Sequence, residues 1–250
     1  MSKKNKDNFK VITFYRFVSI QKIGSIKKYI EIFLRERLVR GTILISKEGI
    51  NGSISGSFKD MNLTINYIKK ILKIRKININ INDSDYLPFN RIKVRLKDEI
   101  IGFDKGKINV NKIHNNHVDP SNWNKLINQK NVKLIDTRNN YEIGIGRFYN
   151  AINPETGSFR EFPKKFEQLK INKTDKLALY CTGGIRCEKA AVFLQKKGFK
   201  RVYQLKGGVL NYLNYTSKRK RKSLWYGECF VFDERVAVNN QLIEGNYMQC

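Results

Sequence analysis

One stretch of the sequence, residues 177–190, constrains the fold more than any other. It begins with four apolar residues typical of a buried strand, continues through Cys181 and a loop that contains Gly183 and Gly184, and ends in a helical pattern. A cysteine at the junction of a strand and a helix lies beneath backbone N–H groups that have no partner within the helix. These groups stabilise a thiolate, so the stretch predicts a reactive sulfur at this junction.

The residues around the cysteine suit this chemistry. A free cysteine with a pKa near ~8.5 is only slightly ionised at neutral pH and needs help to react. Gly183 and Gly184 allow the backbone amides to converge on one anion, and Arg186 is expected to add a cation at the rim of the loop. A buried, inert cysteine is the less favoured alternative. The predicted catalytic residue is Cys181, and the predicted catalytic loop continues with Thr182, Gly183, Gly184, Ile185 and Arg186.

Three further residues are expected to support this loop. Cys187 begins the helix, where it either packs in the core or acts as a second thiol that protects or resolves oxidised Cys181. Asp136 and Arg138 follow the short apolar segment 132–135. We expect them to form a buried or half-buried ion pair that supports the architecture near the site without a catalytic role.

The order of the predicted elements divides the chain into two domains. Over residues 11–96 it is strand, helix, strand, strand, helix, strand, which predicts a split βαβ (ferredoxin/acylphosphatase-like) sandwich, an antiparallel sheet with two helices on one face. After residue 118, strands and helices alternate, which predicts an α/β domain with a mostly parallel sheet. Active sites of such sheets gather at the carboxyl ends of strands, where Asp136, Arg138 and Cys181 fall. The predicted parts are domain 1–97, linker 98–117, domain 118–216 and basic extension 217–250.

Two local signals add detail to this division. Residues 48–52, Glu-Gly-Ile-Asn-Gly, contain the glycines and asparagine of a tight connection between two strands. Asp119 precedes Pro120, a pair that favours the start of a helix with Asp119 as its cap. Both signals predict where elements begin or end.

The charge of the chain indicates a polyanionic partner. Lys and Arg number 49 against 22 Asp and Glu, which gives a net charge of +27. Such a charge produces a strong positive field and favours nucleic acid as partner. The alternative is compositional drift, because Lys, Asn and Ile, which are abundant here, are the residues an AT-rich genome supplies in excess.

The strongest local signal for RNA is a run of five cations followed by two aromatic residues. Cations reach phosphates, and aromatic rings stack on unpaired bases. A solvated basic linker is the alternative, and both interpretations stay open. The predicted RNA-binding residues are Lys218, Arg219, Lys220, Arg221, Lys222, Trp225 and Tyr226.

Cysteine usage and hydropathy predict a cytoplasmic protein. The four cysteines, at positions 181, 187, 229 and 250, fit neither a disulfide framework nor a C-x-x-C zinc pair. No run of about eighteen apolar residues occurs, and no apolar signal segment follows the basic start, so no membrane partner is expected.

His114 and His117 lack partners at metal spacing, and we expect no metal site and no tightly bound cofactor.

Several motifs together resemble a known family. Residues 134–138, 145–154 and 181–186 and the Gly207-Gly208 turn look like a rhodanese domain. With residues 48–52, 159–163, 181–189 and 227–238 added, the chain resembles the bacterial rhodanese-related tRNA uridine hydroxylases from about residue 14 to residue 238. Several long motifs in the same order are far more specific than a lone cysteine loop.

This resemblance implies both a fold and a function. It implies a rhodanese-like parallel-sheet domain and oxygen-dependent formation of 5-hydroxyuridine at the wobble position of tRNA, with Cys181 as the essential residue. Molecular oxygen is then the co-substrate, and the anticodon arm of tRNA is the partner. Longer members carry a cysteine-rich tail, whereas this sequence ends at Cys250. Cys229 and Cys250 alone cannot fill a tetrahedral metal site.

Two other functions stay open at the level of sequence. The first is a sulfurtransferase that moves sulfane sulfur through a Cys181 persulfide. The second is a non-catalytic RNA-binding module that has kept the fold, against which the intact Cys181 loop argues.

Overall fold

The computed structural model describes residues 9–103, 108, 110 and 116–248 of the chain. These residues separate into two compact units. The first contains the described residues up to Ile100 and two short C-terminal segments, Phe232–Val236 and residues 246–248. The second contains Ile101–Val231 and Ala237–Gly245. No helix in the described ranges is long and apolar enough to cross a membrane.

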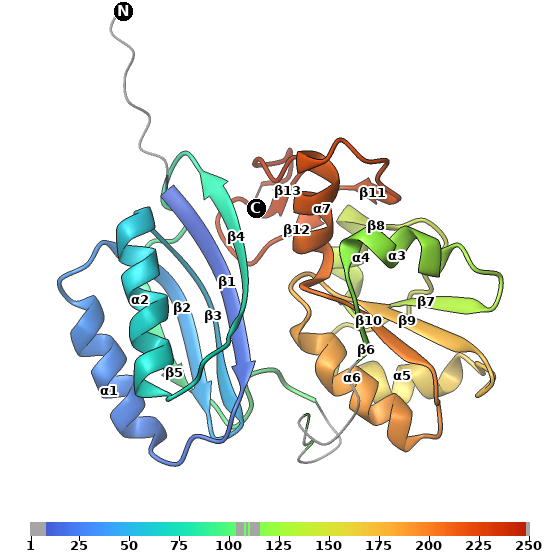
Figure 1. Ribbon diagram of the computed structural model, residues 1–250, viewed down its shortest axis with the longest axis horizontal. Helices are drawn as coiled ribbons and strands as arrows, with labels where there is room; N and C mark the ends of the chain where they lie inside the picture. The colour runs from blue at the N-terminus through green and yellow to red at the C-terminus, as the bar shows by residue number, and fades with distance from the viewer. Residues whose placement is uncertain (1–8, 104–107, 109, 111–115, 249–250) are drawn as a thin grey trace, which may run out of the picture. The chain divides into compact units, whose positions relative to one another are not determined.

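The first unit is a five-stranded sheet with the order β4-β1-β3-β2-β5. Helices α1 and α2 lie together on one face of the sheet (Figure 1), which confirms the split βαβ prediction. Their buried isoleucines pack against alternate residues of the strands, among them Ile43 and Ile54. The elements are β1 (Phe9–Phe17), α1 (Ile23–Leu34), β2 (Val39–Ser46), β3 (Gly49–Gly56), α2 (Phe58–Ile71), β4 (Asn78–Ser84) and β5 (Ile92–Leu96).

Two details of the first unit differ from the sequence prediction. Strand β5 pairs with β2 in parallel, so the sheet is not wholly antiparallel. The connection between β2 and β3 contains only Lys47 and Glu48, and Gly49 already pairs with Ser46. Gly49 is needed for a close approach of strands, because a Cβ atom there would lie 2.1 Å from the carbonyl oxygen of Arg16.

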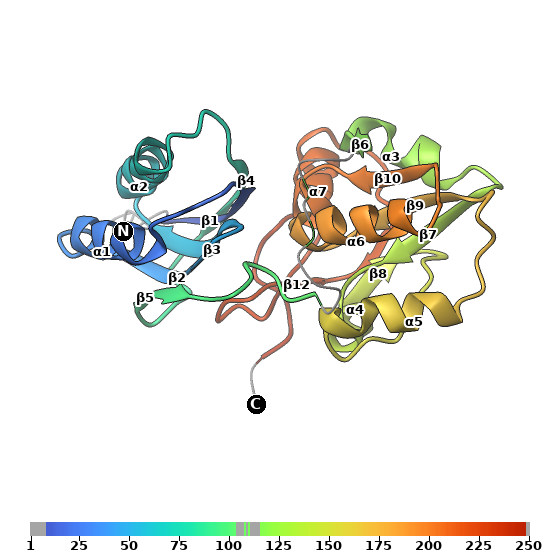
Figure 2. The ribbon, with the colours of Figure 1, turned by 90° about the horizontal axis from the view of Figure 1, so that it is seen from below.

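The second unit is a parallel four-stranded sheet with the order β6-β10-β9-β7. Helices α3 and α7 cover one face and α5 and α6 the other (Figures 1 and 2), which confirms the predicted α/β domain with a parallel sheet. The main elements are β6 (Asn116–Val118), α3 (Pro120–Ile127), β7 (Val132–Asp136), α4 (Asn140–Ile145), β8 (Gly146–Phe148), α5 (Phe162–Gln168), β9 (Lys176–Tyr180), α6 (Ile185–Lys196), β10 (Val202–Leu205) and α7 (Gly208–Lys218).

The first strand of this sheet begins earlier than the sequence suggested. Asn116 and His117 fall in the predicted linker, but in the structure they belong to β6 and pair with β10. Their exposed, polar side chains give no apolar alternation from which a strand could be recognised. Asp119 takes the cap position of α3 as predicted, yet its side chain binds Lys206 at 2.8 Å and makes no cap hydrogen bond.

The residues after 217 are largely structured. Strand β11 (Trp225–Gly227) pairs with β8, and β12 (Cys229–Phe230) pairs with β13 (Ala237–Val238). The segment Phe232–Val236, between β12 and β13, belongs to the first unit. There the Glu234 amide donates to the Pro88 carbonyl at 3.0 Å. The basic extension therefore contributes to both units.

Candidate active site

Cys181 is the first residue after β9, an inner strand of the parallel sheet, and it directly precedes the loop that starts α6. Its side chain is buried, and its Sγ accepts a hydrogen bond from the Gly184 amide at 3.1 Å. Gly184 adopts φ of +100°, a backbone conformation that side chains disfavour. The loop therefore curls around the sulfur as the sequence predicts.

The surroundings of Cys181 favour the thiolate. Burial alone would favour the neutral thiol. A hydrogen bond from the Cys187 thiol, the positive charge of Arg186, and the backbone amides of Arg186 and Cys187 outweigh this effect and lower the pKa of Cys181 to about 6. At neutral pH the sulfur is thus largely ionised and nucleophilic.

Cys187 faces the reactive sulfur. It lies buried in the first turn of α6, and its Sγ is 3.6 Å from the Thr137 hydroxyl. Burial and the neighbouring Cys181 thiolate raise the pKa of Cys187 well above the ordinary value, so Cys187 keeps its proton and acts as a donor. Thr137 also donates to the Tyr180 carbonyl at 2.9 Å, which fixes its hydroxyl. Nothing in the local sequence pointed to Thr137.

The start of α7 binds the backbone of the Cys181 loop. The amides of Val209 and Leu210 donate to the carbonyls of Cys181 and Thr182 at 2.9 and 3.1 Å. Gly208 allows this contact, because a Cβ atom there would lie 2.4 and 2.5 Å from the same two carbonyl oxygens. The predicted Gly207-Gly208 turn therefore supports the site directly.

Arg186 is buried and does not lie at an exposed rim as the sequence analysis expected. Its guanidinium forms two hydrogen bonds with the Glu142 carboxylate, Nη1 to Oε2 at 2.5 Å and Nη2 to Oε1 at 2.7 Å. The Thr182 hydroxyl donates to the same carboxylate at 3.2 Å. A buried cation requires an anionic, hydrogen-bonded partner, and the Glu142 carboxylate is that partner for Arg186.

Glu142, like Thr137, belongs to the site although it was not among the residues predicted from the sequence. Its burial would raise its pKa, but the charge and hydrogen bonds of Arg186 and the charge of Arg138 lower it, so Glu142 is an anion. It also completes a capping box with Asn139 at the start of α4. The spacing of Asn139 and Glu142 could have indicated the helix start, but no local signal indicates the contact with Arg186.

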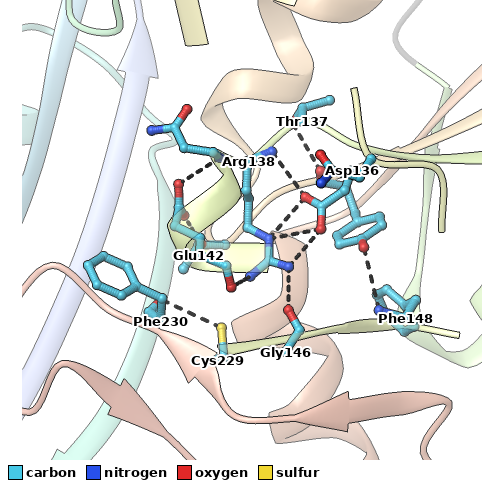
Figure 3. Close-up of polar contacts among 12 residues, drawn as sticks. Asp136, Thr137, Arg138, Glu142, Gly146, Phe148, Cys229 and Phe230 are labelled. Atoms are coloured by element: carbon cyan, nitrogen blue, oxygen red, sulfur yellow. Dashed lines mark hydrogen bonds and ion pairs between the residues drawn. The ribbon is translucent and has the colours of Figure 1, made fainter. Parts of the chain in front are cut away.

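The predicted ion pair of Asp136 and Arg138 is present and fully buried. Arg138 Nη2 lies 2.7 Å from Asp136 Oδ2 and also donates to the Gly146 carbonyl at 2.6 Å (Figure 3). A weaker hydrogen bond of 3.4 Å reaches the carbonyl of Glu142. The pair therefore fixes α4 and β8, and through Glu142 it supports the Cys181 loop.

The other thiols and histidines do not form a metal centre in the described part of the chain. No group of three or more His, Cys, Asp and Glu residues there could hold a metal ion. Cys229 is buried in β12, where burial raises its pKa to about 12 and keeps it a neutral core residue. His117 Nε2 lies 3.1 Å from Glu188 Oε1. His114 and Cys250 lie outside the described residues.

The predicted RNA-binding residues divide into two groups. The five cations of residues 218–222 are exposed, and Tyr226 is 76% exposed. Trp225 is buried, with its ring 5.1 Å from that of Phe148 and 4.9 Å from the Arg138 guanidinium. The prediction that Trp225 stacks on a base is therefore wrong, because pairing of β11 with β8 turns this side chain into the core.

Comparison with known proteins agrees with the two units. Residues 9–100 match the UPF0176 acylphosphatase like domain, and residues 119–215 match the rhodanese-like domain. Among solved structures, a rhodanese-related protein from Thermoplasma volcanium covers 40% of this chain and 92% of that chain, with 22% identity and a TM-score of 0.33.

Three curated relatives extend over nearly the whole chain, and each is named tRNA uridine(34) hydroxylase. The relative from Pelagibacter ubique is 47% identical over 97% of this chain and 79% of its own length. That from Rickettsia bellii is 41% identical over 96% and 97%, and that from a Picosynechococcus strain is 43% identical over 97% and 81%. The chain belongs to the tRNA uridine(34) hydroxylase family.

Proposed function

We propose that this protein hydroxylates uridine 34, the wobble nucleotide of tRNA, to 5-hydroxyuridine, and that Cys181 is its essential catalytic residue. The names of its relatives state hydroxylation of uridine 34 in tRNA. The observation that carries the role of Cys181 is the position of its sulfur, which lies at the end of an inner strand and accepts a hydrogen bond from the Gly184 amide at 3.1 Å. This environment stabilises the thiolate and lowers the pKa of Cys181 to about 6. A thiolate is the form of cysteine that attacks electrophilic carbon or carries sulfane sulfur.

Molecular oxygen is the co-substrate in this proposal. One oxygen atom enters the uracil ring, the other leaves as water, and a cellular reductant supplies two electrons and two protons. The residues of the chain keep the sulfur ionised: Cys187 donates a hydrogen bond, and Arg186 provides positive charge. Glu142 holds Arg186 in place.

The anticodon arm of tRNA is the proposed binding partner. The exposed cations of residues 218–222 suit contacts with phosphates. The net charge of the whole chain, +27, favours binding of a polyanion such as tRNA. Bases of an anticodon loop are already unpaired, which lowers the free energy needed to deliver one into a pocket. The protein then acts in the cytoplasm, where its tRNA substrate is found.

Expression in a host without its own tRNA uridine hydroxylases tests this proposal. We expect 5-hydroxyuridine to appear in total tRNA when the wild-type chain is expressed, measured by mass spectrometry of tRNA nucleosides. The Cys181→Ala variant is expected to give none, whereas Cys229→Ala, which removes an un-ionised core thiol, is expected to keep the product. tRNA without 5-hydroxyuridine, despite abundant folded wild-type protein that binds tRNA, would support a binding module and remove the proposed activity.

A sulfurtransferase is the second candidate function. The observation that favours it is the rhodanese-like match over residues 119–215 combined with a cysteine loop that stabilises an anionic sulfur. Turnover of thiosulfate or a persulfide donor, measured at steady state with a thiol acceptor, distinguishes it. Rapid turnover by wild type without any tRNA product would establish this alternative, and negligible turnover would exclude it.

A further inference from the structure

The short ribbon formed by β8 and β11 has two faces of opposite character. In its antiparallel register, Trp225 lies opposite Phe148 and Tyr226 lies opposite Arg147. Opposed side chains of a two-stranded sheet share a face, and successive side chains alternate between faces. The Trp225 and Phe148 pair therefore defines an inner face, and the Tyr226 and Arg147 pair defines an outer face.

The inner face is packed against β9, the strand that directly precedes the reactive cysteine. The Phe148 and Trp225 rings lie 4.9 and 6.2 Å from the ring of Tyr180, the residue before Cys181. The Phe148 amide also donates to the Tyr180 hydroxyl at 3.4 Å. A ligand held by the ribbon is thus held at a fixed position relative to Cys181.

The outer face presents one cation and two aromatic rings to solvent. Tyr149 and Tyr226 are each 76% exposed, and Arg147, which is paired opposite Tyr226, is exposed as well. The Tyr149 amide donates to the Leu224 carbonyl at 3.3 Å, which continues the strand pairing to this residue. Aromatic rings and guanidinium planes exposed side by side form a platform on which the flat faces of unpaired bases stack.

The basic run lies directly before this platform and is fastened to the same unit. Lys218 ends α7, and the exposed cations continue to Lys222. The Lys222 carbonyl accepts a hydrogen bond from Asn124 at 3.1 Å, and the Leu224 amide donates to the Tyr212 hydroxyl at 2.8 Å. Phosphate-binding charge and base-stacking rings are therefore joined in one short, anchored segment.

We propose that the outer face of the β8–β11 ribbon, formed by Arg147, Tyr149 and Tyr226, stacks unpaired nucleotides of the tRNA anticodon loop while residues 218–222 contact the neighbouring phosphates. The identity of the RNA rests on the proposed function. The preference for a single-stranded loop rests on the rings, since bases inside a duplex have no free face to stack on them. The proposal adds Arg147 and Tyr149 to Tyr226, which the sequence already predicts as an RNA-binding residue.

Binding of a fluorescent anticodon stem-loop RNA, followed by anisotropy, tests the platform. Loss of one stacked base is worth about 1–3 kcal/mol, so Tyr226→Ala and Tyr149→Ala are each expected to weaken binding by about 5- to 150-fold. Tyr226→Phe keeps the ring and is expected to bind like wild type. Arg221→Ala, which removes one cation of the basic run, is expected to flatten the slope of log affinity against log salt by about 0.7. Lys173→Ala, which removes an exposed cation just before β9, is expected to leave the slope unchanged.

A fully paired RNA of the same stem sequence is the control for loop recognition. Tyr226→Ala is expected to leave its affinity unchanged. Equal affinity of Tyr226→Ala, Tyr149→Ala and wild type for the stem-loop would overturn the proposal, as would an equal loss for stem-loop and paired RNA. Binding is measured without turnover, so failure of this platform and failure of the hydroxylase proposal are separate results.

Discussion

Arg186 and Glu142 form an ion pair with two hydrogen bonds, of 2.5 and 2.7 Å, inside the second unit. The pair joins the helix that follows Cys181 to the helix that follows Asp136. It gives the positive charge beside the sulfur a fixed position, because the guanidinium is bound at two nitrogen atoms. The cation is therefore part of the architecture of the site and not a mobile surface group.

Glu142→Gln is expected to destabilise the protein. Removal of one partner from a buried ion pair leaves the other charge uncompensated, which lowers the free energy of unfolding by about 3–5 kcal/mol. Urea unfolding followed by circular dichroism measures this change. The exposed Glu155→Gln is the matched control and is expected to change stability by no more than about 0.5 kcal/mol. Equal stabilities of the two variants would contradict a structural role for the pair.

The ionisation of Cys181 predicts a specific dependence on pH. Its pKa of about 6 in the folded protein lies below that of a free cysteine, so the thiolate is present above pH 6 and is lost as pH falls through that value. The associated stabilisation is complete above pH 9 and declines as pH falls towards 6. Thiolate absorbance at 240 nm, taken as the difference between wild type and Cys181→Ser, is expected to be half-maximal near pH 6. A midpoint near 9 would show that the loop does not activate the sulfur.

Substitutions of Cys187 test the origin of this ionisation. Cys187→Ala removes a hydrogen-bond donor to the thiolate, so the absorbance midpoint of Cys181 is expected to rise. Cys187→Ser keeps a donor and is expected to shift the midpoint less. Identical midpoints in the alanine variant and the wild type would assign the effect to the backbone and Arg186 alone.

Gly208→Ala is expected to displace the Cys181 loop. The new Cβ atom would lie 2.4 Å from the Cys181 carbonyl oxygen, and the backbone φ of +67° already disfavours a side chain. A displacement of the order of 1 Å near a reacting group lowers turnover by about 100-fold. Rates of 5-hydroxyuridine formation measure the loss. Gly144→Ala, which adds a methyl group in open space within α4, serves as control, and its rate is expected to match wild type.

Trp225→Ala separates packing from RNA binding. Trp225 is buried against Phe148, so its truncation is expected to lower the free energy of unfolding by about 3–5 kcal/mol. Tyr226→Ala, on the exposed face of the same strand, is expected to leave stability nearly unchanged. Thermal unfolding of the two variants provides the comparison. If Trp225→Ala were as stable as Tyr226→Ala, the tryptophan would not be the core residue described above.

The parts of the site predicted correctly are those that lie close together in the sequence. An apolar strand, a cysteine, two glycines and a helix occupy adjacent positions, so local geometry alone places Cys181 beneath the amide of Gly184. The same holds for Asp136 and Arg138, two residues apart. The helical spacing of apolar residues was likewise sufficient for both helices of the first unit.

The parts predicted wrongly or missed depend on distant contacts. Glu142 is 44 residues from Arg186, and only the folded sheet brings together the two helices that carry them, α4 and α6. The run of cations before Trp225 predicts an RNA-binding residue, but pairing with β8 places its side chain in the core. Local sequence patterns also do not specify at which edge of the sheet β5 pairs. In the structure it pairs with β2, in parallel.

The central claim is that the Cys181 thiolate is required for hydroxylation of uridine 34. The most direct measurement is the 5-hydroxyuridine content of tRNA from cells that carry Cys181→Ser as their only copy of this protein, at wild-type protein abundance. We predict that 5-hydroxyuridine made by this enzyme is absent and that an added wild-type copy restores it. A wild-type level of 5-hydroxyuridine in the Cys181→Ser cells would contradict the account.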